Sequence, residues 1–166
     1  MTYWFDSNCY VEAHRTYFNI STSPEFWKFL HVQIDNGLIK SPLKVYQELI
    51  EYGDELSTWC KSRHKSGLNT RSSAPGVQLS YATLINHVLT RTPKYKKNVI
   101  DEFYGNADAW VIAHAMSEGG TVVTNESDKT KGGKIKIPTL CDEFDVRCIK
   151  LWEFNKEINF RAADYM

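Results

Sequence analysis

Net charge, long hydrophobic runs and paired cysteines are all missing from this chain of 166 residues. Its 20 basic residues balance its 20 acidic residues, so the overall charge predicts no nucleic-acid partner. No uninterrupted apolar stretch approaches the length of a membrane span, and the first residues contain neither the basic region nor the long apolar region of a secretory signal. We therefore expect a soluble, cytoplasmic protein with no membrane partner.

The four cysteines are widely separated, and no two of them form a C-x-x-C pair. This spacing excludes a zinc knuckle and a thioredoxin-like motif. Thiols in a cytoplasmic protein are expected to stay reduced, and we predict that most of these are buried. The cysteines are Cys9, Cys60, Cys141 and Cys148.

Two kinds of apolar segment alternate along the chain and predict an α/β fold. With 42% hydrophobic and 13% aromatic residues, the chain can bury a sizeable core, and its length fits one domain over residues 1–166. Buried strands are predicted at residues 2–5, 38–40, 121–124 and 146–149. After a first helix that follows residue 6, helical spacing covers residues 23–36, 41–52, 54–61, 77–89, 95–103, 107–118, 139–144 and 151–158. This order predicts a parallel sheet with right-handed crossovers.

Two polar segments interrupt this pattern. Residues 63–76 hold Ser, Gly, Asn, Arg and Pro with few apolar residues, and we interpret them as a mobile loop that could act as a lid or binding loop. Residues 129–136 form a basic loop, which is either a solvated segment or a phosphate contact that makes binding depend on salt. Its lysines are Lys129, Lys131, Lys134 and Lys136.

Five acidic residues lie where apolar segments end or on the inward turn of a predicted helix. Several carboxylates close together are costly to desolvate and repel one another unless a cation lies between them. Ligands of an open parallel sheet collect beyond the carboxyl ends of its strands, so we expect these acids to converge there. Hard oxygen ligands suit Mg²⁺ or Mn²⁺, which catalyse phosphodiester hydrolysis. The acids are Asp6, Glu48, Asp108, Glu126 and Asp128.

The segments around these acids resemble the four motifs of the PIN-domain family, a compact nuclease fold found in many prokaryotic toxin–antitoxin toxins. The motifs agree in order and approximate spacing over most of the chain. The resemblance implies a three-layer fold with a central, mostly parallel sheet of four to five strands flanked by helices. The matching segments are Asp6-Ser7-Asn8 after a hydrophobic strand, Val45-Tyr46-Gln47-Glu48-Leu49, residues 108–115, and residues 122–128.

The resemblance also assigns roles to individual residues. It implies catalytic acids at Asp6, Glu48, Asp108, Glu126 and Asp128, with metal ligands at Asp6, Asp108, Glu126 and Asp128. It implies that Ser7, Asn8, Thr124 and Asn125 hold these acids, or water on the metal, by hydrogen bonds. We expect Lys129, Lys131 and Lys134 to contact RNA.

Two departures from the family pattern concern its fourth motif and its middle. The fourth motif usually has aspartate where this chain has Glu126, whose longer side chain could shift the metal or leave Asp128 as the closer ligand. The stretch between Glu48 and Asp108 is longer than in the smallest members, and its polar loop could set the choice of substrate or antitoxin.

The function predicted from these residues is that of an Mg²⁺- or Mn²⁺-dependent endoribonuclease, most simply the toxin of a toxin–antitoxin pair. Its partners would be an RNA substrate and a cognate antitoxin, and the many Trp and Phe residues allow a homodimer. A PIN-like module that binds nucleic acid or protein without cutting it is one alternative, and a structure-specific DNA nuclease is another.

Each of these residues also has a purely structural interpretation. Asp6 and Asp108 could cap helices, and Glu48 could lie on a solvated helix face. Glu126 and Asp128 could be turn residues. His114 is more simply a hydrogen-bonded core histidine than a metal ligand.

Overall fold

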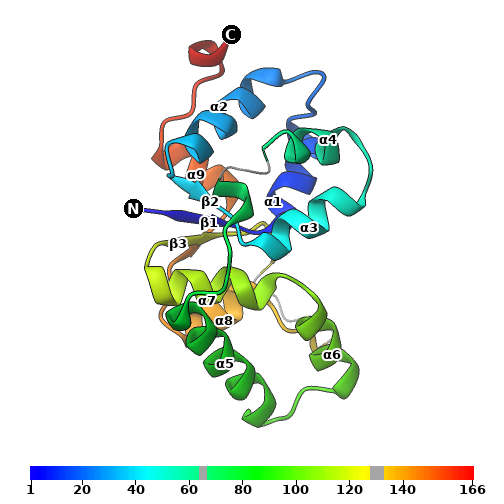
Figure 1. Ribbon diagram of the computed structural model, residues 1–166, viewed down its shortest axis with the longest axis vertical. Helices are drawn as coiled ribbons and strands as arrows, with labels where there is room; N and C mark the ends of the chain where they lie inside the picture. The colour runs from blue at the N-terminus through cyan, green and yellow to red at the C-terminus, as the bar shows by residue number, and fades with distance from the viewer. Residues whose placement is uncertain (64–66, 128–132) are drawn as a thin grey trace.

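The structure is a computed structural model that describes residues 1–63, 67–127 and 133–166. Four short parallel strands form the centre of these residues (Figure 1). Their order is β2-β1-β3-β4. Tyr3 pairs with Ile39 on one side and with Thr121 on the other, while Val122 pairs with Cys148. The strands are β1 (Tyr3–Phe5), β2 (Ile39–Lys40), β3 (Thr121–Val123) and β4 (Cys148–Ile149).

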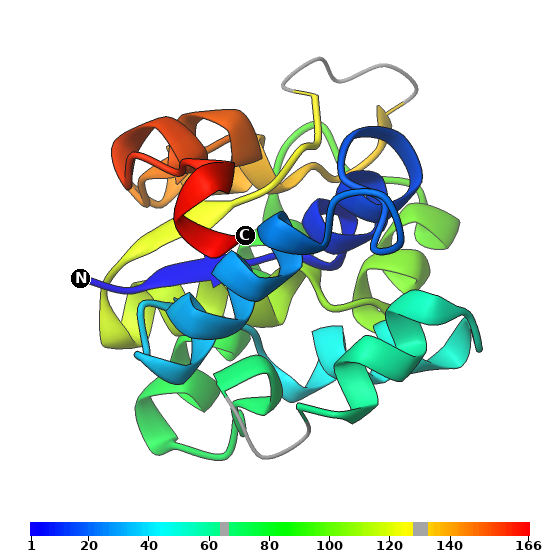
Figure 2. The same cartoon turned by 90° about the horizontal axis from the view of Figure 1, so that it is seen from above.

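Helices cover both faces of this sheet and give three layers (Figure 1). On one face lie α2 and α9, and on the other lie α7, α8 and α5. The view from above shows α2 and the C-terminal turn η4 side by side over the sheet (Figure 2). The α-helices are α1 (Ser7–Glu12), α2 (Pro24–Asp35), α3 (Leu43–Glu51), α4 (Glu55–Lys61), α5 (Pro75–Thr90), α6 (Lys97–Gly105), α7 (Asp108–Glu118), α8 (Ile137–Glu143) and α9 (Leu151–Glu157). Shorter turns are the π-helix η1 (Ala13–Tyr17) and the 3-10 helices η2 (Gly67–Asn69) and η4 (Ala162–Tyr165).

The predicted α/β order and the all-parallel sheet are confirmed. Helix ends follow local chemistry, since Pro24 begins α2 and Gly37, at φ +74°, follows its end. Asp54 caps α4 by accepting a hydrogen bond from the Ser57 N–H at 3.0 Å. The strands are shorter than predicted, and the π-helix was not predicted at all. None of the described helices combines the length and the apolar character that a membrane crossing requires.

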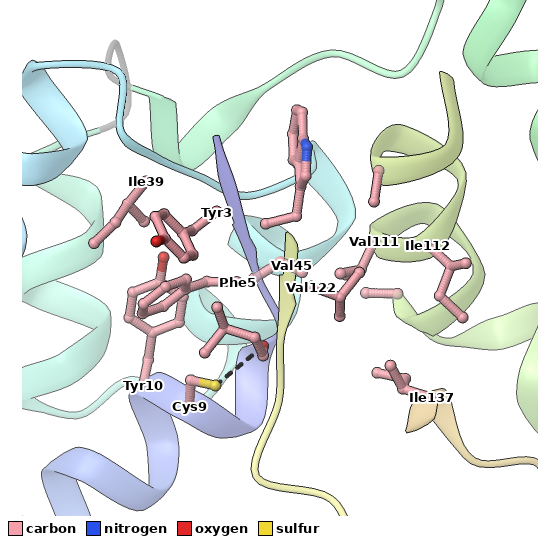
Figure 3. Close-up of a cluster of buried hydrophobic side chains, with 14 of the residues drawn as sticks. Tyr3, Phe5, Cys9, Tyr10, Ile39, Val45, Val111, Ile112, Val122 and Ile137 are labelled. Carbon is pink, nitrogen blue, oxygen red and sulfur yellow. Dashed lines mark hydrogen bonds between the residues drawn. The ribbon is translucent and has the colours of Figure 1, made fainter. Parts of the chain in front are cut away.

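The core lies on both faces of the central strands. Figure 3 shows Tyr3, Phe5 and Tyr10 on one side and residues of α7 and α8 on the other. Cys9 donates a weak hydrogen bond from its thiol to the Val123 carbonyl at 3.2 Å (Figure 3). None of the four cysteines forms a disulfide, and three of them are buried, as predicted; Cys148 is half-buried.

Within the polar segment interpreted as a mobile loop, residues 67–70 are hydrogen-bonded to Ser41, the residue that follows β2. The Ser41 N–H donates to the Gly67 carbonyl at 3.0 Å, and the Thr70 N–H donates to the Ser41 carbonyl at 2.9 Å. Leu68, which lies between Gly67 and Thr70 in the sequence, is buried. Helix α5 then begins at Pro75. Residues 67–70 therefore form an ordered turn within the segment interpreted as a mobile loop, since a buried apolar side chain and β-type pairing hold them.

Candidate active site

A pocket of about 270 Å³, here called the acid pocket, lies beyond the carboxyl ends of β1 and β3. The chain passes from β1 to β2 on one side of the sheet and from β3 to β4 on the other side. The strand order therefore reverses between β1 and β3. Four of the five predicted acids line this pocket, while Asp128 lies outside the described residues. The lining consists of Asp6, Ser7, Asn8, Glu48, Val99, Glu102, Phe103, Asn106, Asp108, Glu126, Lys134, Ile135 and Lys136.

Asp6 follows β1 directly and is only 3% exposed. It occupies the N-cap position of α1 but makes no capping hydrogen bond. Its Oδ2 instead accepts a hydrogen bond from the Thr124 hydroxyl at 3.0 Å. Burial, and then the nearby negative charges of Glu126 and Glu48, raise the pKa of Asp6 to about 7. Capping therefore does not account for Asp6, whose carboxylate is held in the acid pocket at an electrostatic cost.

Asp108 is the first residue of α7 and is half-buried. Its backbone N–H donates to the Asn106 side-chain oxygen at 3.0 Å. Its carboxylate accepts no hydrogen bond from any side chain or backbone group that the structure describes. Burial raises the pKa of Asp108 well above its usual value, and the charges of Asp6 and Glu126 raise it further.

Glu48 connects the starts of two helices. Its Oε2 accepts a hydrogen bond from the Ser7 hydroxyl at 2.8 Å, and its Oε1 accepts one from the Ala107 N–H at 2.8 Å. Burial raises its pKa. The interpretation of Glu48 as a solvated surface residue was therefore wrong, because the side chain points from α3 toward Asp6 and Asp108.

Thr124 organises the turn that follows β3. Its hydroxyl accepts hydrogen bonds from the Asn8 amide at 3.2 Å and from the Glu126 N–H at 3.2 Å. A hydroxyl has one proton, and the shorter of its two acceptor contacts, 3.0 Å to Asp6 against 3.4 Å to Asn8, directs that proton to Asp6. The Asn125 N–H donates to the Asn8 side-chain oxygen at 3.0 Å. Of the predicted hydrogen-bonding residues, Ser7 and Thr124 therefore contact acids, whereas Asn8 bonds to this turn. The side-chain oxygen of Asn125 accepts from the Leu151 N–H at 3.1 Å instead of facing the acids.

The carboxylate of Glu126 is tied to the start of α8. Its Oε2 accepts a hydrogen bond from the Ile137 N–H at 2.8 Å, and its Oε1 lies 3.9 Å from the ammonium nitrogen of Lys136. The side chain of Lys150 donates to the Glu126 carbonyl. Because glutamate is longer than aspartate, the carboxylate of Glu126 can reach the backbone at the start of α8.

The donor set fits a hard divalent cation through two acids. Among the described residues no group of three His, Cys, Asp or Glu side chains is placed to hold an ion. Mg²⁺ needs only one or two carboxylates, however, and keeps several waters. Asp108 supplies a carboxylate that accepts no hydrogen bond from the described residues, and Asp6 supplies one whose nearest donor is the Thr124 hydroxyl at 3.0 Å. Glu48 accepts at 2.8 Å with both of its oxygens, and Glu126 is held by the Ile137 N–H and by Lys136.

Of the lysines predicted to contact RNA, Lys134 lines the acid pocket and is exposed. Lys129 and Lys131 lie outside the described residues. Lys136, from the same basic loop, faces Glu126. Helix α6 also contributes Val99, Glu102 and Phe103 to the pocket, and no pattern in the sequence signalled these three residues.

His114 is a core residue, as predicted. It is buried and stacks on Trp4 with ring centroids 4.5 Å apart. Its Nε2 lies 2.9 Å from the Ser72 hydroxyl and its Nδ1 lies 3.1 Å from Glu118. Burial lowers its pKa. It does not line the acid pocket.

A larger cavity of about 670 Å³ lies beside Asn125 and Lys150 and is lined mainly by aromatic and aliphatic side chains, including Tyr17 and Trp152. None of the four described acids lines it. The smaller acid pocket is therefore the candidate active site, because it gathers the carboxylates whose pKa values are raised.

Comparison with solved structures finds a related fold in the crystal structure of VapBC2 from Rickettsia felis bound to a DNA fragment from their promoter. One chain of that structure aligns with a TM-score of 0.53 at 17% sequence identity, and the alignment covers 90% of this chain and 98% of that chain. Similarity at this identity shows the fold, which is the PIN-like three-layer fold that the motifs predicted. No curated protein matches the chain in sequence. A family model described as Domain of unknown function (DUF4411) matches residues 3–162, and the chain belongs to that family.

Proposed function

We propose that this chain is a cytoplasmic, metal-dependent endoribonuclease that hydrolyses RNA phosphodiester bonds. The observation that carries the proposal is the convergence of Asp6 and Asp108, both with raised pKa values, on one pocket where the strand order of a PIN-like fold reverses. Carboxylates that repel one another in a pocket are stabilised by a cation. Perturbed acids in a cleft are also a general mark of functional sites.

Asp6 and Asp108 would hold Mg²⁺ or Mn²⁺. Such an ion supplies an activated water and neutralises the charge that builds on the phosphate and the leaving oxygen. Thr124 orients Asp6 by donating to its Oδ2. Glu48 accepts from the Ser7 hydroxyl, next to Asp6, and from the Ala107 backbone N–H, next to Asp108, and so links the two ligands. Glu126, and Asp128 from outside the described residues, would complete the negative charge around the ion.

RNA is the proposed substrate, and Lys134 is the proposed contact for a phosphate next to the cleaved bond. The acid pocket, at about 270 Å³, is small, so an unpaired strand fits it better than a duplex. Lys134 is exposed at the rim, where it can offset the repulsion between substrate phosphates and the acids. Lys129 and Lys131 remain predicted contacts.

The test is cleavage of a labelled single-stranded RNA by the purified chain with Mg²⁺ or Mn²⁺. Asp108→Asn should abolish cleavage while the circular dichroism spectrum and melting temperature show a folded protein. Asp164→Asn is the matched control, since Asp164 is exposed in the C-terminal turn. Excess chelator should stop the wild-type reaction. Retained cleavage by Asp108→Asn, or cleavage in chelator, would overturn the proposal.

The chain would act as the toxin of a toxin–antitoxin pair, with an antitoxin protein as its partner. This step rests on the family resemblance and on the PIN-like fold. Expression of the wild type in a bacterial host should arrest growth, and expression of Asp108→Asn should not. Co-expression of a small protein encoded by an adjacent gene should relieve the arrest. Equal arrest by Asp108→Asn would show that toxicity does not come from the acid pocket.

A second candidate function is a PIN-like module that binds nucleic acid without cutting it. The contacts of Glu126 favour this function. Its carboxylate accepts a hydrogen bond from the Ile137 N–H and faces the ammonium group of Lys136, which leaves it less available to a metal ion. Calorimetric titration with Mg²⁺ separates the two functions. A binding module should bind the ion weakly and keep its full affinity for RNA in chelator, whereas the nuclease should bind Mg²⁺ through Asp6 and Asp108.

A further inference from the structure

A second hollow, here called the basic groove, lies next to the acid pocket. It has a volume of about 320 Å³ and is formed by the connection between α5 and α6 together with the residues before α8. Figure 1 shows this connection at the end of the molecule remote from α2. The lining consists of Arg91, Pro93, Lys94, Tyr95, Lys96, Gly133 and Lys134.

The charge of this groove is of one sign. Four of its lining residues are basic, and none of the described residues that line it is acidic. Lys94, Lys96 and Lys134 are exposed. None of these three forms an ion pair with a residue that the structure describes, although the adjacent Lys97 pairs with Asp101 at 2.6 Å. The groove therefore concentrates uncompensated positive charge on a chain whose net charge is zero.

Arg91 is held in place at the start of the groove. Its guanidinium lies 4.2 Å from the centre of the Tyr95 ring and donates to the Tyr95 hydroxyl. A stacked guanidinium is ordered before a ligand arrives, so less side-chain entropy is lost on binding. Its remaining N–H groups can still donate to a phosphate oxygen.

The basic groove and the acid pocket share a wall. Lys134 lines both, so a strand leaving the acid pocket past Lys134 enters the basic groove. The acid pocket alone repels phosphates, because Asp6, Glu48, Asp108 and Glu126 gather there. A polyanion can occupy it only if cations beside it contribute to binding.

We propose that the basic groove binds the phosphate backbone of the RNA strand on one side of the cleaved bond, through Arg91, Lys94 and Lys96, with Lys134 at the junction. This proposal deepens the proposed nuclease function and rests on it for the identity of the substrate. The groove sets where the strand lies and contributes affinity that is independent of sequence.

Binding is tested apart from cleavage, on the Asp108→Asn protein in chelator with a fluorescent single-stranded RNA. The double substitution Lys94→Ala/Lys96→Ala is compared with Lys28→Ala/Lys156→Ala, which removes two exposed lysines from α2 and α9. Since each phosphate contact of a single strand contributes about 0.7 to the slope of log K against log salt, the groove variant should lower that slope by about 1.4. It should also weaken binding by roughly tenfold at moderate salt, while the control pair changes neither.

Two further measurements make each result decisive. Lys94→Arg/Lys96→Arg should restore affinity and slope, because it keeps the charge. Equal weakening by the groove pair and the control pair would overturn the proposal, as would a groove variant with an unchanged slope. Poly-glutamate is the probe for an acidic protein partner. If the groove variant no longer binds poly-glutamate but keeps its affinity for RNA, the groove serves such a partner and the proposal is overturned.

The result also separates the groove from the nuclease. If the wild type cuts no RNA, but substitution of Lys94 and Lys96 weakens RNA binding, the groove proposal holds and the nuclease proposal is refuted. If the wild type cuts RNA, but the groove variant binds RNA with unchanged affinity, the nuclease proposal holds and the groove proposal is refuted.

Discussion

The carboxylate of Glu48 accepts a hydrogen bond from the backbone N–H of Ala107 at 2.8 Å. Ala107 immediately precedes Asp108 at the start of α7, where backbone N–H groups lack helical partners. The other carboxylate oxygen of Glu48 accepts from Ser7, next to Asp6. One side chain on α3 therefore fixes the relative placement of the two proposed metal ligands, which lie about a hundred residues apart in sequence.

Glu48→Ala should destabilise the fold and reduce cleavage. It leaves the Ser7 hydroxyl and the Ala107 N–H without their acceptor, and unpaired donors in a partly buried place cost about 1–3 kcal/mol. Loss of a residue that orients metal ligands reduces activity or metal affinity by roughly 10- to 100-fold. Urea unfolding and RNA cleavage measure the two effects. Glu51→Ala, an exposed change on the same helix, should alter neither, and equal behaviour of both variants would refute this role of Glu48.

Without metal, the stability of the chain should fall as pH rises from about 4 to about 7. The pKa of Asp6 is about 7 in the folded chain against an ordinary value of 3.8, so the folded state binds more protons than the unfolded state between these values. Asp6→Asn keeps an acceptor for Thr124 and removes the charge. At pH 8 in chelator this variant should be more stable than wild type by on the order of a few kcal/mol in the free energy of unfolding. It should therefore melt at a higher temperature.

The measurement for Asp6 is a series of melting curves from pH 4 to pH 8. The difference between Asp6→Asn and wild type should be small at pH 4, where Asp6 is protonated, and largest at pH 8. Asp164→Asn should follow the wild type throughout. A constant difference across the series would mean that Asp6 does not titrate in this range.

Mg²⁺ or Mn²⁺ should reverse this destabilisation. An ion that binds only the folded chain adds about 2.7 kcal/mol at a concentration one hundred times its dissociation constant, and it favours the ionised acids. The melting temperature of wild type at pH 8 should therefore rise with added metal. The double variant Asp6→Asn/Asp108→Asn should show no such rise, and an equal rise in both proteins would place the ion elsewhere.

The fold was predictable because its signals are local. Buried apolar runs marked the strands, and residues such as Pro24 and Gly37 marked helix ends. Strand ends were less accurate, since residue 146 was predicted in a strand that begins only at Cys148, where pairing with Val122 occurs. Pairing depends on a partner far along the chain, which no local pattern contains. The buried Leu68 fixes a segment that its polar neighbours made look like a free loop.

The convergence of Asp6 and Glu126 was predictable from the strand ends, and that of Glu48 and Asp108 from their motifs on helices, but the bonds that set their roles were not. The contact between Glu126 and the Ile137 N–H depends on where α8 starts in space. Asp6 and Glu126 both end apolar segments in the sequence, and only the structure separates a buried acid with a high pKa from one tied to a helix. Lys94 and Lys96 have no periodic pattern, so their place beside the acid pocket appears only in three dimensions.

Gly120→Ala should be the most damaging of the glycine substitutions near the sheet. A Cβ at Gly120 would lie 2.3 Å from the Thr2 carbonyl oxygen, and its φ of +117° is strained for any other residue. That oxygen accepts the Thr121 N–H at 2.9 Å and so starts the pairing of β1 with β3, the strands that lead to Asp6 and Thr124.

Backbone strain alone should cost Gly120→Ala about 1–3 kcal/mol, and the displaced carbonyl adds to this loss. Gly105→Ala is the control, because a Cβ there meets no atom within 4 Å and the residue ends α6. It should leave stability unchanged or raise it by up to about 1 kcal/mol. Urea unfolding of both variants measures the difference. Since a shift of the two strands moves Asp6 relative to Thr124, Gly120→Ala should also lose cleavage under conditions where it is still folded, and full activity in that state would show that the pairing of Thr2 with Thr121 does not position the acids.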